Sequence, residues 1–222
     1  MSLPNVINHQ ISPMTTEHEA CQQCQHLREQ LAERELRIQQ LEALTQNSLR
    51  HDALTGAYNF RVMHEFLTAE LQRSMRTGQP FCFAIIDLDD FNEINETFGR
   101  EAGDRVLSMV AATSGKLLRV LDRFARIGDD EFGILLPVSW LEQGAQAISR
   151  LTDAIGAADW ESVTPGRKLR FSTGLTTNAP ADTPEKMVAR AEKALHQAKA
   201  AGKNRTVQLE EALPEMLLDG EF

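Results

Sequence analysis

The stretch FCFAIIDLDDFNEINETFG, residues 81–99, decides the fold of this chain. Its first eight residues form a nearly continuous apolar run, which is typical of a strand at the centre of a sheet. In residues 91–98 the apolar positions recur at helical spacing instead. A buried strand that passes directly into a helix indicates an α/β protein.

The residues on either side continue this alternation. Gly128 and Asp129 separate two short apolar segments and predict a two-residue hairpin turn between them. The order of elements fits a split βαβ arrangement, so we predict a central mixed sheet with flanking helices, in the α/β (α+β) class. The predicted helices span residues 91–98, 101–120, 143–155 and 184–201, and the predicted strands span residues 81–88, 123–127, 131–137, 169–176 and 204–209.

The first fifty residues have a different character. Residues 1–16 are polar and aperiodic, which predicts a mobile tail. Residues 17–50 contain neither Gly nor Pro, so we expect one long helix there. A heptad frame places Cys24, Leu31, Ile38 and Thr45 at one seam position and Ala20, Leu27, Arg34, Leu41 and Ser48 at the other. Arg34, Thr45 and Ser48 weaken this seam.

A narrow apolar stripe on this charged helix can be buried in two ways. It can pair with the same helix of a second copy, or it can fold back onto the domain. The polar back face favours a dimeric coiled-coil stalk over residues 17–50. Residues 51–209 are then the α/β domain, and residues 210–222 are either a docking helix or a tail.

Composition limits the classes of function. The 222 residues include 42% hydrophobic residues, enough for one core, and carry a formal net charge of −9. That charge argues against a protein that grips a nucleic acid polymer through its phosphates, although a metal ion would still allow a nucleotide substrate. Because no apolar run is long enough to cross a bilayer, we expect a cytoplasmic protein without membrane insertion.

The chain has three cysteines, an odd number, and no export features, so we do not expect a disulfide framework. Cys82 is expected to be a buried strand residue. Cys21 and Cys24 form a C-x-x-C pair near His18 and His26, which could hold a metal or pair across a dimer. A zinc site usually needs a second pair of ligands, and this chain lacks one.

Acidic residues gather at two predicted turns. Asp87 and Asp89 end the strand of residues 81–88, and Asp129, Asp130 and Glu131 lie at the hairpin. Carboxylate oxygens at neighbouring turns suit a Mg²⁺ site for a triphosphate. Acidic residues also favour turns and helix starts for local reasons, so spacing alone leaves both interpretations open.

Four motifs in order resemble the GGDEF-domain diguanylate cyclase family. They are DALTGAYNFRVM, AIIDLDDFNEINETFGREAGDRVL, RIGDDEFGILLP and AEKALHQAKAAGKNR, and the resemblance covers residues 52–209. It implies a palm-like nucleotidyl cyclase fold and a dimer that condenses two GTP molecules into cyclic di-GMP with Mg²⁺ or Mn²⁺. Any input signal would then arrive through altered dimerisation or a regulatory protein on the stalk.

The resemblance also implies site residues. The metal ligands would be Asp87, the backbone carbonyl of Leu88, and Asp130, and the catalytic residues Asp130, as base, and Glu131. Asn95 and Asp104 would contact guanine, which makes chemical sense because a carboxylate accepts from the N1 and N2 donors of guanine. The full set expected at GTP comprises Phe91, Asn95, Arg100, Asp104, Gly128, Asp129, Lys199 and Lys203.

A second site is implied just before the hairpin. Arg119 and Asp122 occupy the place of the R-x-x-D motif through which the product inhibits members of the family, and Arg150 resembles the secondary arginine of that site. Arginine can fork onto a phosphate or stack on guanine, and Asp can accept from the guanine edge.

The chain departs from the family pattern at four positions. Asp129 replaces the second Gly of the signature, which adds bulk and negative charge near the nucleotide. Asn92 replaces a Lys, whereas Arg100 for His and Lys203 for Arg keep or add positive charge. These departures leave a rival interpretation, a degenerate cyclase that acts as a cyclic di-GMP receptor or scaffold. A cyclase with a different dinucleotide product is a third interpretation, and the guanine-facing Asp104 argues against it.

Overall fold

The computed structural model describes residues 30–31, 33–38 and 49–211. The chain divides into two units, residues 1–47 and residues 48–222. Within the first unit, residues 30–31 and 33–38 are helical. The predicted tail at residues 1–16, the Cys21 and Cys24 motif, most of the predicted stalk and residues 212–222 lie outside the described residues.

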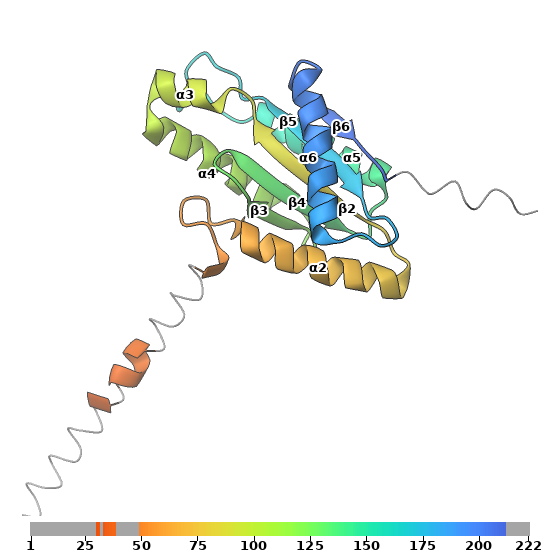
Figure 1. Ribbon diagram of the computed structural model, residues 1–222. Coiled ribbons are helices and arrows are strands. Elements are labelled where there is room, and N and C mark those ends of the chain that lie inside the picture. Colours follow the sequence, from red (N-terminus) through yellow and green to blue (C-terminus); the bar gives the residue numbers. More distant parts are fainter. Residues whose placement is uncertain (1–29, 32, 39–48, 212–222) are drawn as a thin grey trace, which may run out of the picture. The chain divides into compact units, whose positions relative to one another are not determined.

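A six-stranded mixed sheet forms the centre of the second unit, in the order β1-β3-β4-β2-β5-β6 (Figure 1). Strand β2 pairs antiparallel with both β4 and β5, while the outer pairs β1·β3 and β5·β6 are parallel. All eight residues of β2 are buried, as its apolar run predicts. The strands are β1 (Tyr58–Asn59), β2 (Phe81–Leu88), β3 (Arg123–Arg126), β4 (Glu131–Pro137), β5 (Phe171–Thr177) and β6 (Thr206–Gln208).

Helices cover both faces of the sheet. Cys82, Ala84 and Ile86 of β2 belong to the core under α4 and α5, whereas Phe83 and Ile85 point into the core under α2 and α6. This alternation follows from the two-residue period of a strand. The helices are α2 (Phe60–Thr77), α3 (Phe91–Phe98), α4 (Arg100–Leu117), α5 (Leu141–Gly156) and α6 (Pro184–Ala200). Figure 1 shows α2 and α6 together on one face.

Most predicted elements are confirmed, including β2, α3 and β4 with their bounds. Cys82 is buried, and burial raises the pKa of its thiol to about 12, which makes it an inert core residue. Strand β1 and helix α2 are present in addition to the predicted elements. Helix α2 begins at the N-cap Asn59, whose side chain accepts from the Val62 amide, and ends at Gly78 with φ 69°.

The prediction of a two-residue turn at Gly128 and Asp129 is wrong. Residues 127–130 connect β3 to β4, and the amides of Ile127 and Gly128 both donate to the Glu131 carbonyl. Neither Gly128 nor Asp129 has a positive φ. The wider loop needs no left-handed residue, so Asp129 replaces a glycine here without backbone strain.

Candidate active site

The acidic residues of the two motifs meet where β2 ends and β4 begins. Asp87 lies directly across from Glu131 in the β2·β4 ladder, and the Leu88 amide donates to the Asp130 carbonyl at 3.2 Å. Register therefore brings together carboxylates more than forty positions apart in sequence. Asp87, Leu88 and Asp130 line a cavity of about 450 Å³ with Phe91, Lys199 and Lys203.

This carboxylate cluster is electrostatically unfavourable by itself. Burial raises the pKa of Asp87, Asp130 and Glu131, and the charge of Asp87 raises the pKa of the other two further. Lys199 opposes the effect, since its Nζ lies 2.5 Å from Oδ2 of Asp87. Asp87 is buried, and Asp130 and Glu131 are partly buried, so a cation beside these carboxylates would stabilise their charged forms.

The same residues fit a hard divalent cation. Asp87 and Asp130 offer carboxylate oxygens and Leu88 offers a carbonyl, which are the ligands that Mg²⁺ prefers. In the part of the chain that the structure describes, no group of three or more acidic, His or Cys side chains forms a preassembled metal cluster. An ion held by so few protein ligands would complete its shell with phosphate oxygens and water.

The neighbouring Asp89 has a different task from the one its position in the acidic cluster suggested. It is buried, and its carboxylate accepts from the Ser172 hydroxyl and from the Asn204 amide, both at 2.8 Å. Asp89 thus ties the end of β2 to β5 and to the turn before β6.

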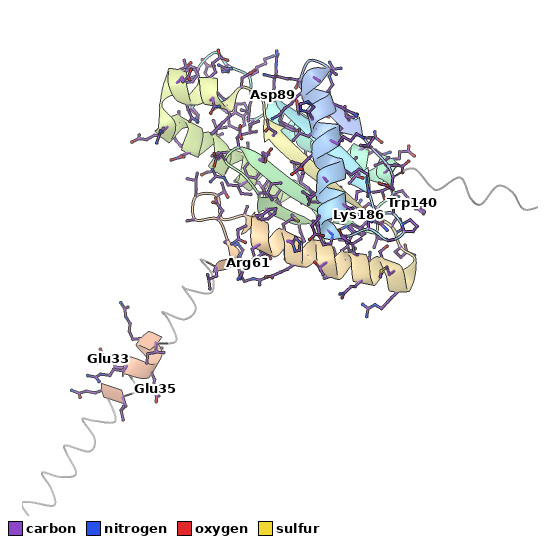
Figure 2. The ribbon with its side chains drawn as sticks, viewed as in Figure 1. Glu33, Glu35, Arg61, Asp89, Trp140 and Lys186 are labelled. Atoms are coloured by element: carbon purple, nitrogen blue, oxygen red, sulfur yellow. The ribbon has the colours of Figure 1, made fainter. Side chains whose placement is uncertain are left out.

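Asp90 and Lys203 form an ion pair of 2.6 Å across the same end of the sheet, and both have a positive φ. Figure 2 shows Asp89 and Trp140 at opposite ends of the domain.

The two residues expected at guanine come from adjacent helices. Asn95 is on α3 and Asp104 is on α4, and the helices are joined at Gly99. Gly103 lets them approach, because a Cβ at this position would lie 2.0 Å from Oδ1 of Asn95. Gly103 was not singled out from the sequence, although it directly precedes Asp104. Arg100, the first residue of α4, is exposed.

An arginine holds the hairpin loop in place. Arg126 donates from Nε to the Gly128 carbonyl at 3.2 Å and from Nη2 to the Asp129 carbonyl at 2.7 Å. Its Nη1 reaches both oxygens of Asp52 at 3.3 Å. Burial favours a higher pKa for Asp52, but hydrogen bonds from Thr55 and the Arg126 charge lower it overall. The carboxylate of Asp52 therefore stays ionised and anchors Arg126.

The three residues expected at a product site also come together. Arg119 and Arg150 line one cavity of about 500 Å³ between the end of α4 and α5, together with Gln143, Gln146 and Ser149. Asp122 accepts from the Arg119 amide at 2.7 Å and lines an adjoining small cavity with Arg150. Burial raises the pKa of Asp122, and the nearby arginines oppose this.

Solved structures with this fold carry GGDEF domains. The complex of the diguanylate cyclase SiaD with its activator SiaC from Pseudomonas aeruginosa matches with a TM-score of 0.70 and 32% identity, over 88% of this chain and 76% of that one. The coiled coil and GGDEF domain of DgcB from Caulobacter crescentus, bound to c-di-GMP, matches with a TM-score of 0.73 over 82% of this chain and 99% of that one. At 23% identity, the second likeness is one of fold.

The family follows from the sequence comparisons. The model of the family described as diguanylate cyclase, GGDEF domain, matches residues 49–205, and this chain belongs to that family. The diguanylate cyclase DgcP of Pseudomonas aeruginosa is 38% identical over 154 residues, which are 69% of this chain and 23% of DgcP. The response regulator PleD of Caulobacter vibrioides is 33% identical over 160 residues, which are 70% of this chain and 35% of PleD. The chain thus spans about a quarter to a third of these relatives.

None of the described helices is long and apolar enough to cross a membrane.

Proposed function

We propose that this protein is a diguanylate cyclase that condenses two GTP molecules into cyclic di-GMP and two pyrophosphates. The observation that carries the proposal is that Asp87 and Asp130 line one cavity with Lys199 and Lys203, and that Glu131 lies directly across from Asp87 in the sheet. Family membership supports the same activity.

In each half of the reaction, the ribose 3′-oxygen of one GTP attacks the α-phosphorus of the other, and pyrophosphate leaves. Asp130 accepts the proton of the 3′-hydroxyl, a role that its raised pKa suits. A Mg²⁺ ion, or Mn²⁺ in its place, held by Asp87, the Leu88 carbonyl and Asp130, would stabilise the charge that develops on the phosphate oxygens. Lys199 exchanges its contact with Asp87 for the phosphates when GTP arrives.

Recognition of the base is assigned to the α3–α4 pair. Asp104 accepts hydrogen bonds from N1 and N2 of guanine, and the Asn95 amide faces O6 and N3 of the same base. Adenine lacks these donors, so it would leave the Asp104 carboxylate unpaired. Phe91, Arg100, Gly128 and Asp129 complete the proposed GTP site.

Each domain binds one GTP, so two domains must meet. We assign this to a homodimer whose stalk spans residues 17–50 and raises the effective concentration of one half-site near the other. Residues 51–209 would then form the catalytic domain, with a tail at residues 1–16 and a C-terminal segment at residues 210–222. Because SiaD was solved with its activator, we extend the proposal to a regulatory protein that binds the stalk.

Cyclic di-GMP is also proposed as an allosteric ligand. Arg119, Asp122 and Arg150 line adjoining cavities, and their charges suit a phosphodiester and a guanine edge. Occupation of this site by the product would inhibit the enzyme.

Product formation from GTP and Mg²⁺ by protein freed of bound nucleotide tests the proposal. We expect cyclic di-GMP from the unaltered protein and a loss of about 10²–10⁴-fold in Asp130→Ala, as for removal of a general base. Asp153→Ala, which removes an exposed carboxylate of α5, is the matched control and should retain activity. Absence of product even after the stalk is replaced by a strong dimerising coil, together with cyclic di-GMP binding that depends on Arg119, would instead identify a receptor.

A further inference from the structure

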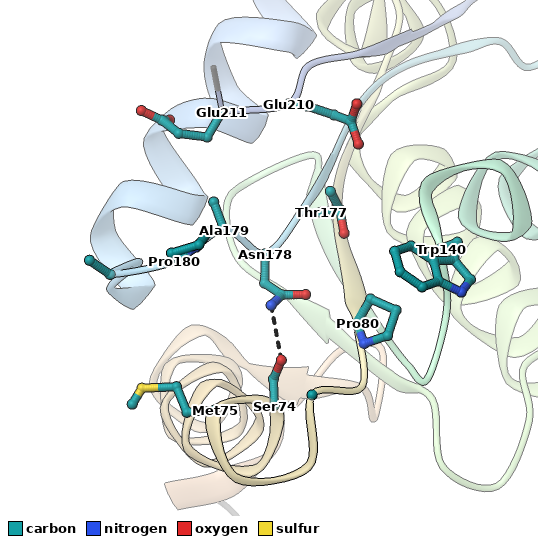
Figure 3. Close-up of a pocket in the computed structure, with 12 residues that line it drawn as sticks. Ser74, Met75, Pro80, Trp140, Thr177, Asn178, Ala179, Pro180, Glu210 and Glu211 are labelled. Atoms are coloured by element: carbon teal, nitrogen blue, oxygen red, sulfur yellow. Dashed lines mark hydrogen bonds between the residues drawn. The ribbon is translucent and has the colours of Figure 1, made fainter. Parts of the chain in front are cut away.

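A second large cavity lies at the opposite end of the sheet from the carboxylates. It measures about 630 Å³ and opens between the end of α2, the start of α5 and the loop between β5 and α6 (Figure 3). Met75 and Trp140 line it and are 75% and 66% exposed. Pro80, Ala179 and Pro180 add further apolar surface. Large apolar side chains gathered around a cavity are typical of a binding site.

Several polar groups of this cavity already form hydrogen bonds within the domain. Asn178 accepts from the Phe81 amide at 2.8 Å and donates to the Ser74 hydroxyl at 2.9 Å, the bond drawn in Figure 3. The Thr177 hydroxyl donates to the Phe81 carbonyl. An occupant would therefore be held mainly by burial of its apolar side chains against Met75 and Trp140.

The chain runs to the rim of this cavity after its last strand, β6. After β6, the Leu209 amide donates to the Leu175 carbonyl, and Glu210 and Glu211 line the cavity. Glu211 forms an ion pair with Arg190 there, at 2.9 Å. The Arg190 side chain is buried, whereas that of Glu211 is largely exposed. Figure 3 shows the two glutamates across the cavity from Met75.

The residues after Glu211 include apolar side chains that could cover the exposed apolar lining of the cavity. Residues 212–222, ALPEMLLDGEF, lie outside the described part of the chain and contain Leu213, Met216, Leu217 and Leu218. The spacing of Leu213, Met216 and Leu217 is i, i+3, i+4, which would put these three side chains on one face of a helical turn. Eleven residues span up to about 36 Å when extended, ample for a return across the cavity.

From these observations we propose that residues 212–222 dock into the cavity beside Met75 and Trp140 and bury their apolar side chains there. The occupant is thus the C-terminal segment of the same chain, which begins directly after the ion pair of Glu211 with Arg190. This inference does not depend on the proposed cyclase activity, because the cavity lies at the other end of the sheet from Asp87 and Asp130.

Tryptophan fluorescence tests the docking directly. The chain has two tryptophans, and Trp160 is buried, with its indole N–H bonded to the Ile155 carbonyl at 2.7 Å, so only Trp140 can respond to the segment. We expect deletion of residues 212–222 to shift emission to the red and to raise acrylamide quenching of Trp140 about twofold, since the segment would cover much of its exposed ring. In Trp140→Phe the deletion should change nothing.

Two further variants locate the contact. Met75→Glu places a charge in the cavity at an exposed helix position, so the fold should persist while quenching rises to the level of the deletion variant; Met75→Leu should behave as the unaltered chain. A peptide of residues 212–222, added at about 1 mM to match the effective concentration of a short tether, should restore protection to the deletion variant.

Equal quenching of Trp140 in the full chain and the deletion variant would overturn the proposal. Protection that disappears on dilution would overturn it as well, because it would identify a second copy of the chain as the occupant.

Discussion

Arg126 binds Asp52 and the signature hairpin at the same time, with Nη1 3.3 Å from both carboxylate oxygens and Nη2 2.7 Å from the Asp129 carbonyl. Asp52 follows the predicted stalk almost directly in the sequence, and the hairpin carries Asp130 and Glu131. A charge-assisted contact therefore joins the entry of the domain to the loop that presents its carboxylates.

We expect Asp52→Asn to lower turnover about tenfold, because a loosened Arg126 lets the hairpin loop drift from its reactive position. The free energy of unfolding should fall by about 1–2 kcal/mol, as for loss of a hydrogen bond to a charged group. Steady-state kinetics and urea denaturation measure the two effects. Glu70→Gln, which breaks the Arg73 ion pair on α2, is the control for loss of a carboxylate elsewhere. Unchanged turnover in Asp52→Asn would show that Arg126 positions the hairpin loop without its contact to Asp52.

Gly103→Ala should impair substrate binding through Asn95. The added Cβ would lie 2.0 Å from the Asn95 Oδ1, so the Asn95 amide must move away from its present position. We expect KM for GTP to rise about tenfold, the loss of roughly one hydrogen bond. Gly115→Ala, on the same helix and with nothing within 4 Å of the added Cβ, should leave KM unchanged and stabilise α4 slightly. Equal KM values in the two variants would show that Asn95 does not contribute to GTP binding.

Asp130→Asn should stabilise the protein in the absence of metal at neutral pH while abolishing activity. The folded-state pKa of Asp130 is raised by burial and by Asp87, so the folded state binds a proton more tightly than the unfolded state does. Stability contributed by the protonated carboxyl is present below the unfolded pKa of about 3.8 and is lost as pH rises through the folded pKa.

Melting temperatures from pH 4 to pH 8 check this prediction. The advantage of Asp130→Asn over the unaltered protein should be largest at pH 7–8 and should shrink towards pH 4. Added Mg²⁺ with a non-hydrolysable GTP analogue should stabilise the unaltered protein and have much less effect on the variant. A variant that melts lower than the unaltered protein at pH 7 would contradict this electrostatic account.

Arg150→Ala should relieve product inhibition without lowering turnover in the absence of product. Arg119 and Arg150 line one cavity, and loss of one charged hydrogen-bond donor to a phosphate corresponds to about a tenfold weaker complex. Initial rates measured over a range of added cyclic di-GMP give the inhibition constant. Arg76→Ala, at the exposed end of α2, is the matched control. Inhibition that persists unchanged in both Arg150→Ala and Arg119→Ala would exclude this site.

Local pattern was sufficient for much of the fold and for the motifs. The apolar run at residues 81–88, the helical spacing after it and the four motifs each act over a few residues, so β2, α3, β4 and the family could be predicted. Helix α2 was missed although Asn59 and Gly78 cap it. The two-residue turn was wrong because hydrogen bonds to the Glu131 carbonyl close a wider loop.

What the sequence by itself determined is the set of chemical groups: the carboxylates at two turns, the pair Asn95 and Asp104 that is proposed to contact guanine, the two lysines and the R-x-x-D motif. Only the tertiary structure decided how each group is used. Asp87 and Asp89 are two residues apart, yet Asp87 faces Lys199 and the cavity while Asp89 holds Ser172 and the Asn204 amide. Strand register and the packing of distant segments set these partners, and no local pattern records them.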